Sequence, residues 1–188
     1  MESENENQLL QLQKQVDELK NKVNKLEKSR KDQLSIAIVS GDMDRLLATM
    51  IISLAAAASD TKVKLFFSFW ALSALRDPKK KAQGKDFMSK MFGFMLPKGK
   101  NKLKLSKLNM AGMGPVMIKG LMKKQHVLSL DEMFKQAAEL GIEISVCEMS
   151  MNLMGFKKEE MIDYPGLKFV GAATFVADAA ESGIQLFI

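Results

Sequence analysis

The sequence predicts a three-layer α/β/α domain on a parallel sheet of about five strands, preceded by an N-terminal helix of coiled-coil type. Two observations lead to this α/β prediction. From Gln33 onward, short apolar strand patterns alternate with helix patterns, which is typical of βαβ units and therefore of parallel strands. Residues 1–32 instead keep a heptad spacing of apolar side chains and contain no glycine or proline.

The N-terminal segment has apolar residues at alternating spacings of three and four. Heptad positions a hold Leu9, Val16 and Val23, and positions d hold Leu12, Leu19 and Leu26. Three heptads are at the lower limit for a stable coiled coil. We therefore expect residues 1–32 to form an oligomerisation helix that works together with an interface in the domain over 33–188. A solitary solvent-facing helix is the alternative.

Apolar periodicity and turn residues divide the domain over 33–188 into elements. The expected strands are Leu34–Ser40, Val63–Phe69, Ile142–Val146, Lys168–Gly171 and Ile184–Ile188. The expected helices are Asp44–Ala58, a helix starting at Trp70–Leu75, Phe87–Leu96, Gly112–Lys124, a helix from Ser129 to Gly141, Met149–Met161 and Ala172–Ser182. Ser129 and Glu132 have the spacing of a capping box. The order of the strands in the sheet does not follow from this pattern.

The composition indicates one compact domain with an appendage in a reducing compartment. The chain has 188 residues, 47% of them hydrophobic, and a single cysteine, which permits no internal disulfide. The longest apolar run, Leu46–Ala58, is interrupted by Thr49 and Ser53 and is too short to span a bilayer. The N-terminus is polar and lacks the apolar core of a signal peptide. We therefore expect a cytoplasmic protein.

Positive charge is concentrated in one part of the chain. The net charge is +6, and the segment from Arg76 to Lys107 contains eleven basic residues against only Asp77 and Asp86. Such a field favours anionic ligands or partners. The apolar face expected over Phe87–Leu96 could pack on a neighbouring subunit, line the entrance to a cysteine pocket or touch an anionic membrane surface. Nucleic-acid binding is not favoured, because no recognition motif accompanies the basic stretch Lys79–Lys107.

Cys147 is the candidate reactive residue, since it ends an expected strand just before an expected helix. Ligands in open parallel sheets bind beyond the carboxyl ends of the strands. Free N–H groups at a helix start favour the thiolate, which is the nucleophilic form of cysteine. A small buried apolar residue is an equally weighted interpretation of the same position.

Methionine is concentrated around this cysteine. Twelve of the fifteen methionines lie between Met88 and Met161, and Met149, Met151 and Met154 follow Cys147 closely. These polarizable side chains could line a pocket that keeps water from a reactive sulfur atom, or they could be ordinary core residues. A Cu(I) site built from Cys147, Met149 and Met151 is a third interpretation, disfavoured because no histidine or second cysteine accompanies it.

The remaining candidates carry weaker signals. Gly112 and Gly114 could form a backbone nest for an anion, although a tight turn is the favoured interpretation. Asp42 follows a strand end and could be polar lining or a turn residue. His126 is the only histidine, and nothing in its spacing directs it to Cys147. We expect no metal site and no cofactor.

Four segments resemble the DsrE-like branch of the DsrE/DsrF/DsrH group, which comprises small α/β sulfur carriers and sulfurtransferases. They are Phe66–Leu75, Lys90–Leu96, Leu103–Gly114 and Val146–Phe156. The run Cys-x-Met-Ser-Met-x-x-Met-Gly is the most specific part, and the resemblance covers nearly all of residues 33–188. It departs at Ala71, where we expect the family to have glycine.

The resemblance implies that Cys147 accepts sulfur as a persulfide and passes it to an acceptor thiol in a homo-oligomer. Trp70, the three methionines after Cys147 and the Gly112–Gly114 turn would line its pocket. The donor and acceptor would be thiols or persulfides, which we expect to be carried by proteins. Whether the chain acts as a sulfurtransferase or as a stoichiometric carrier is not decided by the sequence.

A different class of function is a non-catalytic oligomeric scaffold in which Cys147 is buried and inert. The two hypotheses differ in whether the folded chain presents a reactive thiol. A peroxidase is disfavoured under either one, because no second cysteine is present to resolve a sulfenic acid.

Overall fold

The structure is a computed structural model that describes residues 2–29, 31–80 and 87–188. The chain divides into two compact units, Met1–Lys31 and Asp32–Ile188. The second unit contains a five-stranded, all-parallel sheet flanked by helices, which confirms the predicted fold class. Lys81 and Lys85 of the basic stretch, together with Asp86, lie outside the described residues.

The first unit is one helix, α1 (Glu2–Ser29), as expected from the absence of glycine and proline. Leu12, Val16, Leu19 and Val23 are 45–60% exposed. The side chains of Leu9 and Leu26, the remaining heptad residues, lie outside the described part of the chain. An apolar stripe thus runs along a helix whose pairing with another helix stays a prediction.

The strands of the sheet agree with the expected ones to within two residues at each end. They are β1 (Gln33–Ile38), β2 (Lys62–Phe67), β3 (Glu143–Cys147), β4 (Lys168–Val170) and β5 (Ile184–Phe187). Their order is β4-β3-β2-β1-β5, so β2 lies at the centre and β3 beside it.

The helices differ more from expectation. Those of the second unit are α2 (Met43–Ala58), α3 (Phe87–Met95), α4 (Met113–Lys124), α5 (Leu130–Glu139), α6 (Glu148–Leu153) and α7 (Ala172–Ala180). The 3-10 helices are η1 (Phe69–Leu75), η2 (Lys100–Lys102), η3 (Met110–Gly112) and η4 (Lys158–Glu160). The capping box of Ser129 and Glu132 is present at the start of α5.

The expected continuous helix over Met149–Met161 is wrong. Helix α6 ends at Leu153, and the chain reverses at Gly155, whose φ of +63° is a left-handed conformation that glycine adopts readily. A side chain at Gly155 would overlap Ser89, so this close approach also requires glycine. Apolar periodicity continued through the turn because Met154, Phe156 and Met161 are all buried on the core side.

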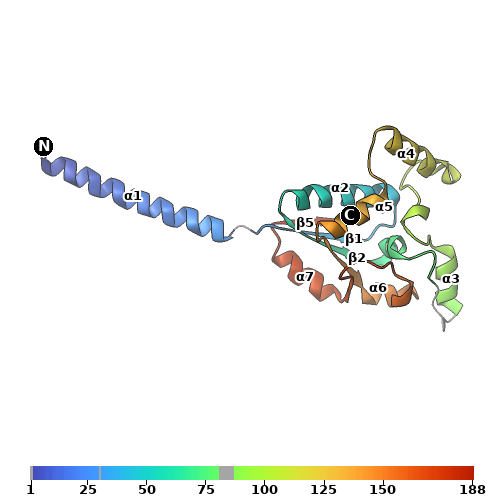
Figure 1. Ribbon diagram of the computed structural model, residues 1–188. Helices are drawn as coiled ribbons and strands as arrows, with labels where there is room; N and C mark the ends of the chain where they lie inside the picture. The colour runs from blue at the N-terminus through green and yellow to red at the C-terminus, as the bar shows by residue number, and fades with distance from the viewer. Residues whose placement is uncertain (1, 30, 81–86) are drawn as a thin grey trace. The chain divides into compact units, whose positions relative to one another are not determined.

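Two faces of the sheet are covered differently. Helices α2 and α5 contact each other on one face, and α7 lies on the other (Figure 1). Ile36, Leu65 and Ile144 stand side by side in three strands and are fully buried in the main core. The described helices include none that is long and apolar enough to cross a membrane.

Alternate residues of the same strands face α7. Lys64 of β2 pairs with Asp178 of α7, and Phe66 stacks on Phe175 with ring centroids 5.2 Å apart. In register, Ser145 is the partner of Phe66. Because side chains alternate along a strand, Cys147 points to the same side as Ser145, away from the main core.

Candidate functional site

The candidate site lies where β2 and β3 end. Cys147 is the last residue of β3 and the N-cap of α6. Phe67 pairs with Val146, so Ser68 and Cys147 are the next residues of the two adjacent strands. Ser150 is three residues further on, which brings its side chain back toward Cys147 after nearly one helical turn. Strand register and helical periodicity thus bring three small polar side chains together.

Hydrogen bonds connect these three residues in a line. Ser150 Oγ donates to Cys147 Sγ over 3.3 Å, and the hydroxyl oxygens of Ser68 and Ser150 are 2.8 Å apart. Since Ser150 has a single hydroxyl hydrogen, giving it to sulfur leaves its oxygen to accept the Ser68 hydroxyl. All three side chains are buried, and Cys147 is only 2% exposed.

The pKa of the Cys147 thiol lies below its ordinary value. Burial alone would raise this pKa, because it penalises the charged form. Hydrogen bonds from the Ser150 hydroxyl and from the N–H groups of Ser150 and Met149, together with the nearby polar Ser68 hydroxyl, outweigh burial and lower it. The surroundings therefore stabilise a thiolate, which is the nucleophilic form.

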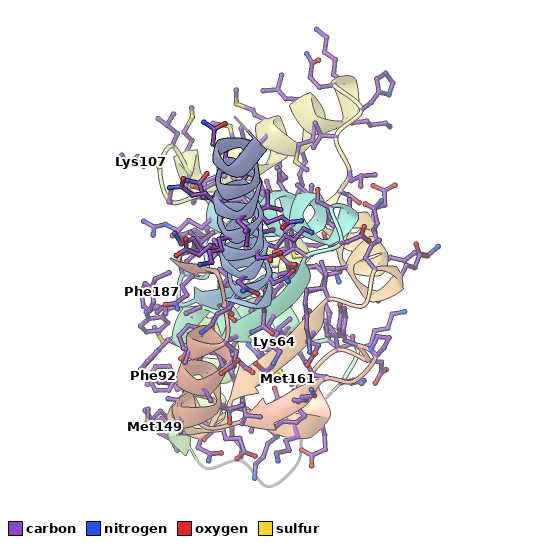
Figure 2. The ribbon with its side chains drawn as sticks, turned by 90° about the vertical axis from the view of Figure 1, so that its left-hand side faces the viewer. Lys64, Phe92, Lys107, Met149, Met161 and Phe187 are labelled. Atoms are coloured by element: carbon purple, nitrogen blue, oxygen red, sulfur yellow. The ribbon has the colours of Figure 1, made fainter. Side chains whose placement is uncertain are left out.

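An apolar surface adjoins the buried thiol. Helix α6 contacts η1, and both carry exposed apolar side chains. Met149 and Trp70 are 57% and 51% exposed, and Leu153 and Phe69 are exposed as well. Figure 2 shows Met149 near the margin of the molecule in that view. A partner molecule that reached Cys147 from this side would meet apolar surface first.

The three methionines predicted around the cysteine do not share one environment. Met151 and Met154 are buried members of the main core, whereas Met149 is on the surface. This division does not favour a joint Cu(I) site of Cys147, Met149 and Met151. Among residues 2–29, 31–80 and 87–188, no cluster of three or more His, Cys, Asp or Glu side chains is placed to hold a metal ion.

The glycine turn expected near the site makes local hydrogen bonds. The N–H groups of Gly112 and Gly114 both donate to the carbonyl oxygen of Asn109, at 2.8 and 3.2 Å. These donors are therefore engaged in a turn, with Gly112 at a φ of +97°. An anion nest at this point would have to compete with those bonds.

Asp42 and Trp70 lie at neighbouring strand ends. Asp42 accepts a hydrogen bond from Ser40 Oγ at 2.7 Å and lies 3.7 Å from Arg45. A Cβ at Gly41 would stand 2.6 Å from the carbonyl oxygen of Trp70, so the turn after β1 packs directly against η1. Asp42 makes its polar contacts with Ser40 and Arg45, and they do not include Cys147.

Sequence reasoning missed Ser68 and Ser150. The spacing of three between Cys147 and Ser150 was available as a helical signal. Ser68 offered none, because it lies 82 residues from Ser150 and meets it only through the register of β2 and β3.

Fold and site together define a class: a single-cysteine α/β protein whose thiol ends a strand next to the centre of a parallel sheet. The chain belongs to the DsrE/DsrF/DrsH-like family, whose sequence pattern matches residues 30–187. This membership confirms the resemblance found in the sequence.

Two relatives align with most of the chain. The chain is 43% identical over 154 residues to "Uncharacterized protein YrkE" of Bacillus subtilis, covering 82% of this chain and 95% of that protein. It is 32% identical over 160 residues to "Sulfur carrier protein DsrE2" of Allochromatium vinosum, covering 83% and 98%.

Proposed function

We propose that this protein is a sulfur carrier that holds sulfane sulfur as a persulfide on Cys147. The observation that carries the proposal is the set of hydrogen bonds from the Ser150 hydroxyl and the α6 backbone to the buried Cys147 sulfur, with Ser68 hydrogen-bonded to Ser150 behind it; these surroundings lower the pKa of the thiol. The relative named a sulfur carrier protein supports the same function. A carrier of this kind needs one cysteine, which is what the chain has.

The loading step is a nucleophilic displacement at sulfur. The Cys147 thiolate attacks the outer sulfur of a donor persulfide, the donor S–S bond breaks, and the donor leaves as a thiolate. With thiosulfate as donor, sulfite is the leaving group. Unloading is the same displacement by an acceptor thiolate. No net oxidant or reductant is consumed, so no cofactor is required.

Access to the sulfur atom sets a condition on this chemistry. Because Cys147 is 2% exposed, the α6 and η1 side chains have to move when a donor or acceptor thiol approaches. The exposed apolar side chains on these elements would contact a protein partner during transfer. We place the carrier in a reducing cytoplasm, as a homo-oligomer that meets protein thiols or persulfides.

The burial of Cys147 also favours a second candidate, a non-catalytic scaffold with an inert thiol. An inert cysteine would behave as a small core residue and would react only after unfolding. The two functions therefore predict opposite results in one labelling experiment.

The test is intact-protein mass spectrometry after incubation with a small-molecule persulfide or thiosulfate. A carrier gains the mass of one sulfur atom, loses it on adding a thiol, and shows no gain as Cys147→Ser. Alkylation by iodoacetamide is measured in parallel on folded and unfolded protein. No sulfur gain from either donor, together with alkylation only in the unfolded protein, would exclude the carrier and leave the scaffold.

A further inference from the structure

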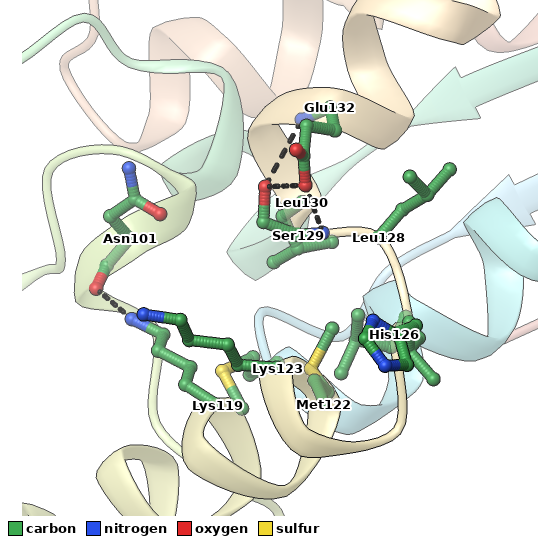
Figure 3. Close-up of a pocket in the computed structure, with 12 residues that line it drawn as sticks. Asn101, Lys119, Met122, Lys123, His126, Leu128, Ser129, Leu130 and Glu132 are labelled. Atoms are coloured by element: carbon green, nitrogen blue, oxygen red, sulfur yellow. Dashed lines mark hydrogen bonds between the residues drawn. The ribbon is translucent and has the colours of Figure 1, made fainter.

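A cavity on the α2 and α5 side of the sheet takes no part in the chemistry of Cys147. Its volume of about 540 Å³ lies in the usual range for small-molecule sites. It is formed where α4, the loop after it and the start of α5 meet α2 (Figure 3). Its apolar lining consists of Met43, Leu47, Met122, Val127, Leu128 and Leu130.

The apolar lining suits an aliphatic chain. Met43 and Leu130 are nearly fully buried, whereas Val127 and Leu128 are 41% and 39% exposed. A ligand that covered these two side chains would remove apolar surface from water. Phenylalanine, tyrosine and tryptophan are absent from the twelve residues that line the cavity, and its single ring is the imidazole of His126, so the lining favours an aliphatic chain over a large flat ring. Methionine and leucine adapt well to a flexible chain.

Two lysines give the cavity a basic edge. Lys119 and Lys123 are one turn apart on α4, and Figure 3 shows both side chains extending toward Asn101. Lys119 Nζ donates to the Asn101 carbonyl oxygen at 2.8 Å. In the described part of the chain, neither lysine has a carboxylate within ion-pair distance. Two neighbouring ammonium groups repel each other, and an anion between them relieves that repulsion.

The carboxylate in the lining is already engaged. Glu132 accepts hydrogen bonds from the N–H and the hydroxyl of Ser129, at 2.8 and 2.7 Å, as part of the cap of α5. Those bonds hold the pKa of Glu132 below its usual value. With two lysines against one glutamate, the lining residues keep a net positive charge, and His126 is a further polar residue of the lining.

We propose that this cavity binds a linear aliphatic molecule with an anionic head group, such as a fatty acid or an alkyl phosphate. The chain lies against the six apolar side chains, and the head group accepts hydrogen bonds from Lys119 and Lys123. Cys147 does not line the cavity, so binding is independent of the persulfide chemistry.

The first measurement is calorimetric titration of decanoate into the full-length protein. We expect saturable binding of one molecule per chain. Acetate, which has the head group without the chain, should not bind measurably. Decanol, which has the chain without the charge, should bind about tenfold more weakly. Decyl phosphate in the same assay decides whether the site prefers a phosphate or a carboxylate head group.

Variants on neighbouring positions of α4 give the matched comparison. Lys123→Gln should weaken decanoate binding about tenfold, whereas Lys124→Gln, one residue further and outside the lining, should leave it unchanged. Cys147→Ser should also bind decanoate as the unaltered protein does. The proposal is overturned if neither decanoate nor decyl phosphate binds saturably, if decanol binds as tightly as the better of these two anions, or if the two lysine substitutions have equal effects.

Discussion

Ser150 Oγ donates a hydrogen bond to Cys147 Sγ over 3.3 Å, and Ser68 from the adjacent strand end is hydrogen-bonded to Ser150. A hydrogen bond to sulfur stabilises the thiolate more than the thiol, because the thiolate is the stronger acceptor. This contact is the structural feature from which the reactivity of Cys147 follows.

Replacing Ser150 by alanine should make Cys147 less reactive. The pKa of the thiol should rise toward its ordinary value, so alkylation by iodoacetamide near neutral pH should become several-fold slower. The measurement is the alkylation rate of the folded protein as a function of pH. Ser145→Ala is the matched control. Ser145 lies on β3 with Cys147, but its hydroxyl donates to the carbonyl oxygen of Leu65 and not to the cysteine sulfur. Equal rates for both variants would contradict the assignment.

Acid should weaken the sheet through Glu143. This carboxylate of β3 lies 2.7 Å from Lys168 on β4 and 3.0 Å from Lys62 on β2, and the hydrogen bond from Lys168 leads in lowering its pKa to about 2. A depressed carboxyl pKa adds stability above the unfolded value, and that stability is lost as pH falls through the folded value. The contribution should therefore disappear between pH 4.5 and about 2.

The check is the melting temperature of the protein and of Glu143→Gln across that pH range. The difference between them should shrink as the pH falls. Glu139→Gln, at an exposed pair 4.0 Å from Lys135, should follow the unaltered protein at every pH. A constant offset for Glu143→Gln would show that its ion pairs contribute nothing pH-dependent.

The buried pair of Arg76 and Glu160 should be essential for stability. Both side chains are 3% exposed, with Nη2 and Oε2 3.4 Å apart, and the guanidinium also donates to the carbonyl oxygens of Gly93, Leu96 and Pro97. Removing one partner takes the opposite charge away from a buried ion. Arg76→Met should therefore cost about 3–5 kcal/mol of unfolding free energy in urea denaturation.

A double-mutant cycle separates the pair from its surroundings. Glu160→Gln alone should be similarly costly, and Arg76→Met with Glu160→Gln should cost less than the two single losses combined. Strictly additive losses would mean that the two side chains act independently of each other.

The heptad helix should contribute to self-association. Leu19→Lys puts a charge at a d position of the exposed apolar stripe of α1 and should lower the mass measured by light scattering. Asn21→Lys, at a solvent-facing f position of the same helix, should not. Removing residues 1–31 should lower the mass as well. An unchanged mass after that removal would contradict the prediction and show that the domain over 32–188 assembles without the helix.

The strands and most helix starts could be predicted because their signals are local. Alternating apolar runs identified the five strands, and the Ser129–Glu132 spacing identified the start of α5. The end of α6 was mispredicted, because buried Phe156 and Met161 continue the apolar pattern beyond the turn at Gly155. Apolar periodicity indicates which side chains face the core. It cannot distinguish a continuous helix from a helix followed by a turn whose side chains are also buried.

By itself, the sequence determined the α/β class, the separate N-terminal helix, the family and the position of Cys147 at a strand end before a helix. These depend on residues close together in the chain and on short motifs. Only the tertiary structure decided that Ser68 and Ser150 meet at the cysteine and that Met151 and Met154 belong to the core. It also decided that Lys119 and Lys123 lie at the edge of a cavity that Cys147 does not line. Strand order, register and the packing of helices bring together residues far apart in the chain, and no local pattern encodes those distances.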